Sequence, residues 1–452
     1  MAPRRGITLA KTDFPLYVVR SLGCNYFLIA GGGGCAKTGV SNTVKIFELN
    51  STGPSYEAKC VSVCDTGSKA TMNAATFGNE KGYVLAAGLE EECQLYSIKP
   101  LKEKPDNIGP VRQEAGDGRE ETADDKKDTT LRHRHVPKDT QPEKLKKTST
   151  AKGEDKSIKD KHSQQSGEAT EVERMFEFEK LGCILTDFHA DGGFQKAVRF
   201  SSDKSLLVTG GADGFLRVWK HPSLEKLYEV KAHSGEIDDL DISPAGDKIV
   251  TVLKEGQPKV WQTKDGSAVV DLPWEDQGGI AYRSRNCRFA PVDGSTKACT
   301  LFTTHIPKQR SGKHVPCYLT KWNTKTWSVE KLQSTGSEVL SCLAVSDEGK
   351  FVAVGTIPGD VIIYIAFSLQ RVYRAQATHG IFVTGLDFLP SRKESQAAHA
   401  RAHDASLLSV SADNQVQIHH VPCRTMISVV WVIIGFVLAL LMAYMLLDTV
   451  GL

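Results

Sequence analysis

Short apolar segments alternate with polar turns along most of the chain, and the clearest example runs from Lys196 to Trp219. Two apolar segments, Val-Arg-Phe and Leu-Leu-Val-Thr-Gly, are separated by the polar turn Ser201–Lys204. The dipeptide Asp213-Gly214 then precedes a third, Leu-Arg-Val-Trp. Apolar runs of this length favour β-strands, and Asp-Gly is a strong hairpin signal. The segment therefore predicts three consecutive antiparallel strands.

The same order of strands and turns recurs with a period near 42 residues, the spacing from Trp219 to Trp261 and again from Trp322 to Tyr364. This period, with four short strands per copy, is typical of the blades of a β-propeller. Seven copies can be counted, so we predict an all-β, seven-bladed propeller. The last strong strand of each copy contains, in order, Phe47, Tyr96, Trp219, Trp261, Trp322, Tyr364 and about Ile418.

One long segment, residues 101–170, interrupts the repeat. It contains no Phe, Tyr or Trp and is rich in Lys, Glu, Asp, Thr, Ser and Gln. Such a composition cannot bury enough apolar surface to offset the entropy of ordering. We therefore predict a disordered charged insert between blades, with blades 1 and 2 in residues 1–100 and blades 3–7 in 171–424. The basic run Lys144–Lys147 leaves a minor nuclear pool open, although a solvated spacer explains it more simply.

The C-terminal end has a different pattern, because residues 426–447 include no charged side chain. As a helix this segment would be about 33 Å long, which matches a hydrocarbon core of about 30 Å. Trp431 and Tyr444 lie toward its two ends, where aromatic rings favour the membrane interface. The sequence thus predicts one transmembrane helix, with the propeller in the cytosol and residues 448–452 as a short lumenal tail.

Composition narrows the function classes. The net charge is +2 with 24% charged residues, so the chain lacks the strongly basic character that usually accompanies nucleic-acid binding. The 11 cysteines are odd in number and scattered, which favours reduced thiols over a disulfide framework or a zinc site. No motif of a metallohydrolase or a serine hydrolase is present.

The most unusual local sequence is Gly31–Asn42, which contains four consecutive glycines followed by Cys-Ala-Lys-Thr-Gly-Val-Ser-Asn. It differs at one position from the phosphate-binding P-loop motif, but a P-loop must be followed directly by a helix. Here the alternating sequence Thr-Val-Lys-Ile-Phe-Glu-Leu follows, which predicts a strand. We expect an extended loop between two strands of blade 1. Its exposed backbone could hold a cation or a partner, or it could be an ordinary hairpin loop.

Several separate strings, taken in order, resemble the Sec-twelve family of WD-repeat propellers. They are Phe-Pro-Leu-Tyr, Ala-Gly-Gly-Gly-Gly-x-x-Lys-Thr-Gly, Ala-Thr-Met-Asn, Thr-Gly-Gly-x-Asp-Gly-x-x-Arg-Val-Trp-Lys, Lys-Ala-His-x-Gly-Glu-Ile and Tyr-Ile-Ala-Phe-Ser-Leu-Gln. The resemblance covers nearly the whole chain, including the apolar C-terminal segment, and fails only in the charged insert. His233 and His379 stand where the repeat family has histidines with a structural role.

The resemblance implies a guanine-nucleotide exchange factor of the endoplasmic-reticulum membrane that loads GTP onto a Sar-type small GTPase and so starts COPII coat assembly. It further implies a loop that contacts the GTPase and binds a potassium ion, with Asn42 as the asparagine important for exchange. The ion's individual ligands stay undefined. Two alternatives remain: a membrane-tethered adaptor propeller and a DNA-binding transcriptional regulator. The residues carried over to the GTPase-contacting loop are Gly31, Gly32, Gly33, Gly34, Lys37, Thr38, Gly39 and Asn42.

Overall fold

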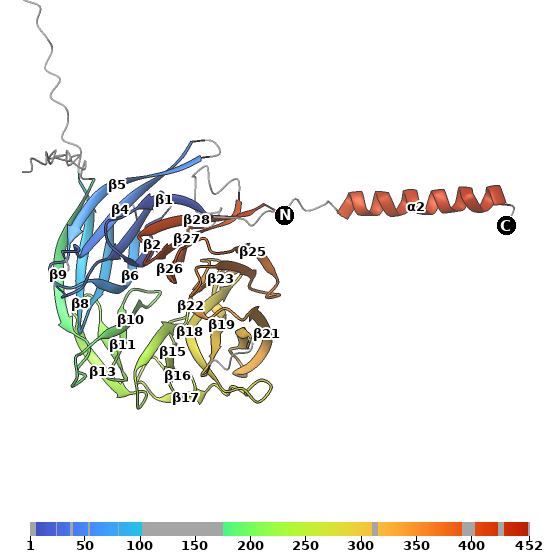
Figure 1. Cartoon of the computed structure of the whole chain (residues 1–452). Helices are drawn as coiled ribbons and strands as arrows, with labels where there is room; N and C mark the ends of the chain where they lie inside the picture. Colours follow the sequence, from blue (N-terminus) through green and yellow to red (C-terminus); the bar gives the residue numbers. More distant parts are fainter. Residues whose placement is uncertain are drawn as a thin grey trace, which may run out of the picture. The chain divides into compact units, whose positions relative to one another are not determined.

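The computed structural model describes residues 6–23, 25–36, 39–52, 55–79, 81–101, 175–309, 315–390, 403–423 and 429–450. Its strands form seven four-stranded antiparallel sheets (Figure 1). The innermost strands β2, β6, β10, β14, β18, β22 and β26 each contact the next, and β26 contacts β2, so the ring is closed. The predicted seven-bladed propeller is confirmed.

Blades 1 to 6 each consist of four strands that follow the chain from the centre outward. Blade 1 contains β2 (Leu16–Ser21), β3 (Tyr26–Gly31), β4 (Thr43–Thr52) and β5 (Ser55–Asp65). Blade 2 contains β6 (Thr71–Asn79), β7 (Gly82–Leu89), β8 (Glu92–Pro100) and β9 (Phe176–Leu185). Blade 3 contains β10 (Gln195–Phe200), β11 (Leu206–Gly211), β12 (Phe215–Lys220) and β13 (Glu225–Lys231).

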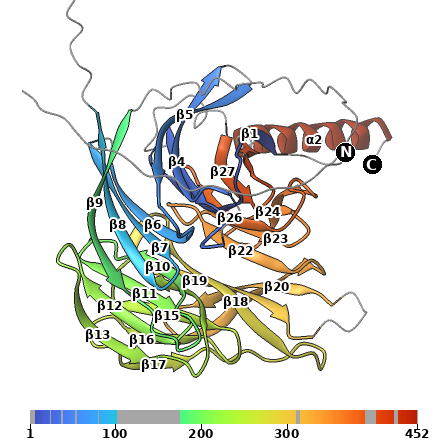
Figure 2. The same ribbon diagram turned by 60° about the vertical axis from the view of Figure 1, so that its left-hand side comes forward.

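The second half of the ring repeats this plan (Figure 2). Blade 4 contains β14 (Ile237–Ile242), β15 (Lys248–Leu253), β16 (Lys259–Gln262) and β17 (Ala268–Asp271). Blade 5 contains β18 (Tyr282–Val292), β19 (Ser295–Pro307), β20 (Cys317–Asn323) and β21 (Ser328–Gly336). Blade 6 contains β22 (Leu340–Val345), β23 (Phe351–Thr356), β24 (Val361–Ile365) and β25 (Arg371–Ala375). Blade 7 contains β26 (Val383–Phe388), β27 (His403–Ser411), β28 (Gln415–Pro422) and, from the other end of the chain, β1 (Ile7–Lys11).

Blade 7 is completed by the N-terminal strand. β1 pairs with β28 in antiparallel register, for example Ile7 opposite Ile418. The first and last strands of the propeller therefore lie in one sheet, which ties the two ends of the ring together. The sequence prediction assigned residues 1–100 to blades 1 and 2 alone and is wrong for β1.

The position predicted for the charged insert is also corrected. β8 and β9 are neighbours in the same sheet, with Pro100 opposite Phe176. The insert therefore lies within blade 2, between its third and outermost strands, and not between blades. β9 carries charged residues at several exposed positions, so its strand pattern is weak in the sequence. The structure of residues 102–174, which include Lys144–Lys147, lies outside the described part of the chain.

Apolar side chains fill the spaces between adjacent sheets. Between blades 1 and 2, for example, Val18, Leu28, Ala74 and Leu85 belong to one buried cluster. Three tryptophans are fixed in orientation by hydrogen bonds within their own blades, and Trp322, which is fully buried, donates its indole N–H to Thr303 at 2.7 Å. Because buried polar atoms without partners are costly, these bonds fix the orientation of the indole rings.

The two ends of the propeller are distinguished by the direction of the inner strands. Thr384, near the start of β26, donates its hydroxyl to the carbonyl oxygen of Leu16 at the start of β2. Near the ends of the same strands, the Ser21 amide donates to Asp387. These two inner strands therefore run in the same direction. We call the end where inner strands begin the loop face, and the opposite end the far face.

The C-terminal helix α2 (Val429–Val450) covers most of the predicted span at 426–447. Its side chains are described at 433–444 and at 446, and apolar ones such as Phe436 and Met442 are exposed. In the described part of the chain, no helix is long and apolar enough to cross a membrane.

Candidate functional site

The glycine-rich loop connects β3 to β4 at the loop face. Gly31 pairs with Thr43 across the base of the loop, and the amide of Gly32 donates to the carbonyl oxygen of Pro15 at 3.1 Å. A Cβ on Gly31 would lie 1.9 Å from that same carbonyl oxygen, so only glycine fits. Strand β4 follows the loop directly, which confirms that the sequence is not a P-loop.

Gly32 is also required at the base of the loop. Its φ of +142° is a conformation that residues with side chains rarely adopt. A Cβ there would lie 2.2 Å from the Asn42 side-chain oxygen and 2.6 Å from the Asn42 Cα. The two ends of the loop therefore approach closely only because this residue has no side chain.

Asn42 closes the loop from inside. Its Oδ1 accepts a hydrogen bond from the Gly34 amide at 2.9 Å. Its Nδ2 donates to the carbonyl oxygens of Gly34 at 3.2 Å and Gly67 at 3.0 Å. The residue is only 5% exposed. The amide group therefore fixes the loop conformation and links it to the β5–β6 connection, which gives Asn42 a positioning role.

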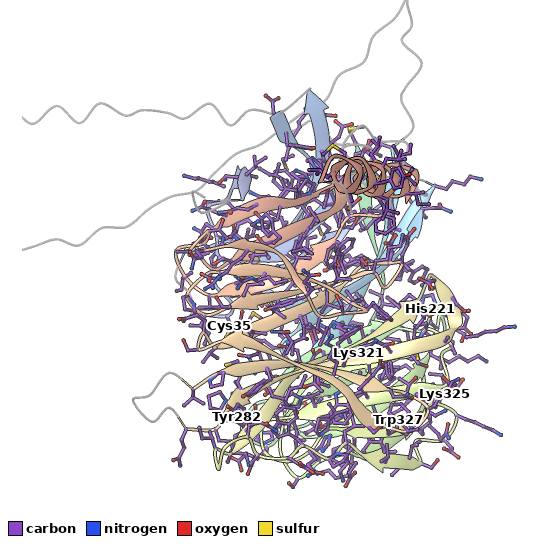
Figure 3. All side chains as sticks on the ribbon, turned by 90° about the vertical axis from the view of Figure 1, so that its right-hand side faces the viewer. Cys35, His221, Tyr282, Lys321, Lys325 and Trp327 are labelled. Carbon is purple, nitrogen blue, oxygen red and sulfur yellow. The ribbon has the colours of Figure 1, made fainter. Side chains whose placement is uncertain are left out.

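The tip of the loop is open to solvent. Cys35 is exposed, and nothing lies within 4 Å of a Cβ built on Gly34 or Gly39. Figure 3 shows Cys35 on the same side of the propeller as Tyr282, the first residue of β18. On the opposite side are His221, Lys325 and Trp327, which follow third strands of their blades. Lys37 and Thr38, two of the predicted site residues, lie outside the described part of the chain.

An acidic turn of blade 2 lies next to the loop. A hydrogen bond from Cys35 to Glu90, together with the negative charge of Glu90, raises the pKa of the exposed thiol. Lys69, from the β5–β6 connection, forms ion pairs with Glu91 at 2.7 Å and with Glu92 at 3.2 Å. These residues were not predicted from the sequence. The signal was available, because residues 90–91 connect the second and third strands of blade 2, as the glycine-rich loop does in blade 1.

The chemistry offered by this site is that of backbone groups. Among the residues that the structure describes, no group of three or more His, Cys, Asp and Glu side chains could hold a metal ion. What the loop presents instead is carbonyl oxygens and amides of glycines, held in place by Asn42. His233 and His379 lie elsewhere and have structural contacts: their Nε2 atoms are 2.7 Å from the hydroxyls of Thr251 and Ser409 respectively.

Comparisons with known proteins agree with the fold and extend it. The family "WD domain, G-beta repeat" matches residues 182–220, which include most of blade 3. The chain is 38% identical to "Guanine nucleotide-exchange factor SEC12" of Mus musculus, over 99% of this chain and 98% of that protein. The protein of the same name from Rattus norvegicus is 37% identical over the same shares.

A more distant relative is "SEC12-like protein 2" of Arabidopsis thaliana, which is 30% identical over 50% of this chain and 52% of that protein. The matches to the two rodent proteins extend across the glycine-rich loop, all seven blades and α2, since they leave out only 1% of the chain. The chain therefore belongs to the SEC12 family of guanine nucleotide-exchange factors.

Proposed function

We propose that this chain loads GTP onto a Sar-type small GTPase at the endoplasmic reticulum, and so starts COPII coat assembly and transport to the Golgi. Membership in the SEC12 family over nearly the whole chain carries the proposal. The chain acts as a regulator of the GTPase, and the exchange of nucleotide requires no covalent step. The blade 1 loop, with its glycine backbone exposed at the loop face, is the part of the surface best suited to this task.

Exchange follows from differential binding. A GTPase holds GDP through its own P-loop, Mg²⁺ and switch segments. A partner accelerates GDP release only if it binds the nucleotide-free conformation more tightly than the loaded one. A loop that already has its bound shape loses little entropy on binding, so more of its contact energy is available for that difference. The contacts with the GTPase are proposed for the accessible Gly33, Gly34 and Gly39 and for Lys37 and Thr38. The buried Gly31, Gly32 and Asn42 hold these residues in place.

A potassium ion is proposed to support this loop through backbone carbonyl oxygens between Gly31 and Asn42. The residues fit such an ion in kind, because a hard cation takes oxygen ligands and successive glycines leave carbonyl groups uncovered. The Gly34 and Gly67 carbonyls both accept hydrogen bonds from Asn42 Nδ2, so carbonyl oxygens of two connections face the same side chain. When bound, the ion would be coordinated by carbonyl oxygens of this loop and would stiffen it.

The C-terminal segment is proposed to anchor the propeller to the endoplasmic-reticulum membrane as a single span, with the propeller in the cytosol. The absence of charge over residues 426–447 and the exposed apolar side chains of α2 support this arrangement. Asn50 provides a test of sidedness, because it is exposed and begins the glycosylation sequon Asn50-Ser51-Thr52. It should stay unmodified in cells, and a glycan on Asn50 would contradict the cytosolic placement.

The exchange proposal is tested by measuring GDP release from a purified Sar-type GTPase with the full chain in detergent. We expect fast release in potassium buffer and slower release in sodium buffer at equal ionic strength. The variant Gly32→Ala should slow release by about tenfold or more, since the loop base must open to accept the methyl group. Gly235→Ala is the matched control, because a Cβ there meets nothing within 4 Å.

Each outcome separates the candidate functions. Release without any acceleration by the wild-type chain in potassium would refute exchange and leave a membrane-tethered adaptor. Acceleration that persists in Gly32→Ala would place exchange at another surface. Equal rates in potassium and sodium would remove the ion from the proposal and leave the exchange activity intact.

A further inference from the structure

The central channel holds three arginines that come from alternate blades. Arg20 lies on β2, Arg199 on β10 and Arg288 on β18. All three line one cavity of about 320 Å³, which is also lined by Lys204 and Asp387. The charged side chains around this space are therefore four cations and one carboxylate. Lys204 is exposed, so the buried charges of the lining are the three arginines and Asp387, and a buried charge is costly unless an opposite charge compensates it.

Two of the arginines are held from behind by carboxylates. Arg199 donates from Nε to Asp241 at 3.2 Å, and Arg288 donates from Nη1 to Asp239 at 2.7 Å. Neither aspartate lines the cavity. Including them, the buried cluster has three arginines against three carboxylates, and the exposed Lys204 adds a fourth cation at its edge. The carboxylates orient the guanidinium groups, whose side chains retain 14% and 20% exposure, and so leave further N–H groups for the cavity.

Among the residues that the structure describes, no carboxylate is in hydrogen-bond contact with Arg20. Its Nε donates to the Ala74 carbonyl at 2.9 Å and its Nη1 to the Val19 carbonyl at 2.9 Å. Within the described part of the chain these bonds use two of its five N–H donors. Burial lowers the pKa of Arg20 to about 10, and the positive charges of Arg199 and Arg288 act in the same direction. An anion between the three groups would relieve both effects.

The cavity lies toward the far face. Its lining includes Ser21 and Thr76 near the ends of β2 and β6, whereas the glycine-rich loop connects at the beginning of β2 through the pairing of Leu16 with Gly31. A ligand here would occupy the opposite end of the channel from the loop. Binding at the two sites is therefore sterically independent, and this inference does not rest on the exchange activity.

We propose that this cavity binds a small phosphate-bearing anion through Arg20, Arg199 and Arg288. Arginine presents a planar fork of N–H donors that matches the oxygen atoms of a phosphate group. Three such forks arriving from blades 1, 3 and 5 can surround one phosphate or bridge two. Ser21 and Thr76 line the same space and add polar residues to the wall of the cavity.

The test is isothermal titration calorimetry of the full chain in detergent. The titrants are pyrophosphate and inositol hexakisphosphate, and chloride keeps the ionic strength constant. We expect saturable binding to the wild type. Arg20→Gln should weaken it by about tenfold or more, because hydrogen bonds to a charged group are lost. Asp387→Asn should tighten it several-fold, because the one carboxylate of the lining loses its charge. The exposed arginine variant Arg371→Gln is the matched control and should bind as the wild type does.

The two variants of opposite sign make the proposal falsifiable even if one fails to fold. Equal affinity of wild type and Arg20→Gln for the anion, or no tightening in Asp387→Asn, would overturn it. A heat of mixing that depends only on ionic strength and does not saturate would overturn it as well. The source of the phosphate is resolved by comparing a soluble inositol phosphate with a short-chain phosphoinositide of the same headgroup. Tighter binding of the lipid would assign a membrane headgroup, and equal or weaker binding a soluble metabolite.

Discussion

Replacing Asn42 with alanine tests the idea that the blade 1 loop works because it is held in one conformation. The substitution removes the hydrogen bonds to the Gly34 amide, the Gly34 carbonyl and the Gly67 carbonyl. Each net contribution is about 0.5–1.5 kcal/mol, for a total of about 1.5–4.5 kcal/mol. Gly67 is exposed and Gly34 half-buried, so water replaces part of the loss. We expect about 2 kcal/mol, which corresponds to about 30-fold in the population of the ordered loop.

Two measurements check this number independently. Amide hydrogen exchange at Gly34 should accelerate by about 30-fold, because that N–H loses its acceptor. GDP release from the GTPase should slow by a similar factor if only the ordered loop is competent. Ser41→Ala, at the exposed neighbouring position, serves as the control and should change neither rate.

The result that refutes the reasoning is equally definite. If Gly34 exchanges at the wild-type rate in Asn42→Ala, the loop does not depend on Asn42 for its order. If the Gly34 amide exchanges faster in the variant but GDP release is unchanged, Asn42 orders the loop but this order is irrelevant to nucleotide exchange. Asn42→Asp sharpens the distinction, because it keeps an acceptor for the Gly34 amide while losing both donors to the carbonyl oxygens.

Three further predictions concern the propeller. Arg217→Met should lower the free energy of unfolding by about 3–5 kcal/mol in urea titration. Arg217 lies 2.7 Å from the buried Asp213 carboxylate, and the substitution leaves that carboxylate without its partner. Burial lowers the pKa of His419 to about 3, against about 6.5 in the unfolded chain, so its contribution to stability is complete above about pH 6.5 and is lost as the pH falls toward 3. Urea titrations should show a loss of about 2 kcal/mol from this residue between pH 7 and pH 5, and a shallower pH dependence in His419→Gln. Deletion of residues 1–11 should lower the melting temperature and promote association seen in size-exclusion chromatography, because it exposes the edge of β28.

The number of blades could be predicted because one strand of every copy is both buried and strongly apolar. Phe47, Tyr96 and Trp219 all lie on third strands, and their spacing survives even where the other strands are irregular. Outer strands could not be predicted as well. β9 and β13 are exposed along most of their length, so many of their side chains are polar and the alternation of apolar and polar residues is weak.

Blade 7 shows why single positions are harder to predict than elements. The sequence placed its marker at about Ile418, but the residue in the position of Trp219 is His419. Trp219 lies opposite Leu207 and donates to Thr209, and His419 lies opposite Leu407 and bonds to Ser409 at 2.8 Å. A histidine can fill the polar part of the tryptophan's role without its bulk, and an apolar pattern alone does not reveal that exchange.

The site was predictable in place but not in detail. Four glycines mark a loop with unusual backbone freedom, and the structure confirms that Gly31 and Gly32 have no room for a side chain. The bonds of Asn42 to Gly67, and the ion pairs of Lys69 beside the loop, depend on how the β5–β6 connection folds back. Contacts of this kind join segments that are distant in the sequence, so no local pattern encodes them.

The closure of blade 7 by β1 has a consequence for how the protein is made. Ile7 pairs with Ile418, so the first strand to leave the ribosome waits for one of the last. At about 5–20 residues per second, that interval is about 20–80 s. During it, β1 has no sheet to join, and by its end six blades form an open arc whose two end sheets each have an apolar face that blade 7 will cover. Newly made chains are therefore most exposed to wrong partners just before synthesis ends, and a chaperone that shields apolar surface would have its largest effect at that moment.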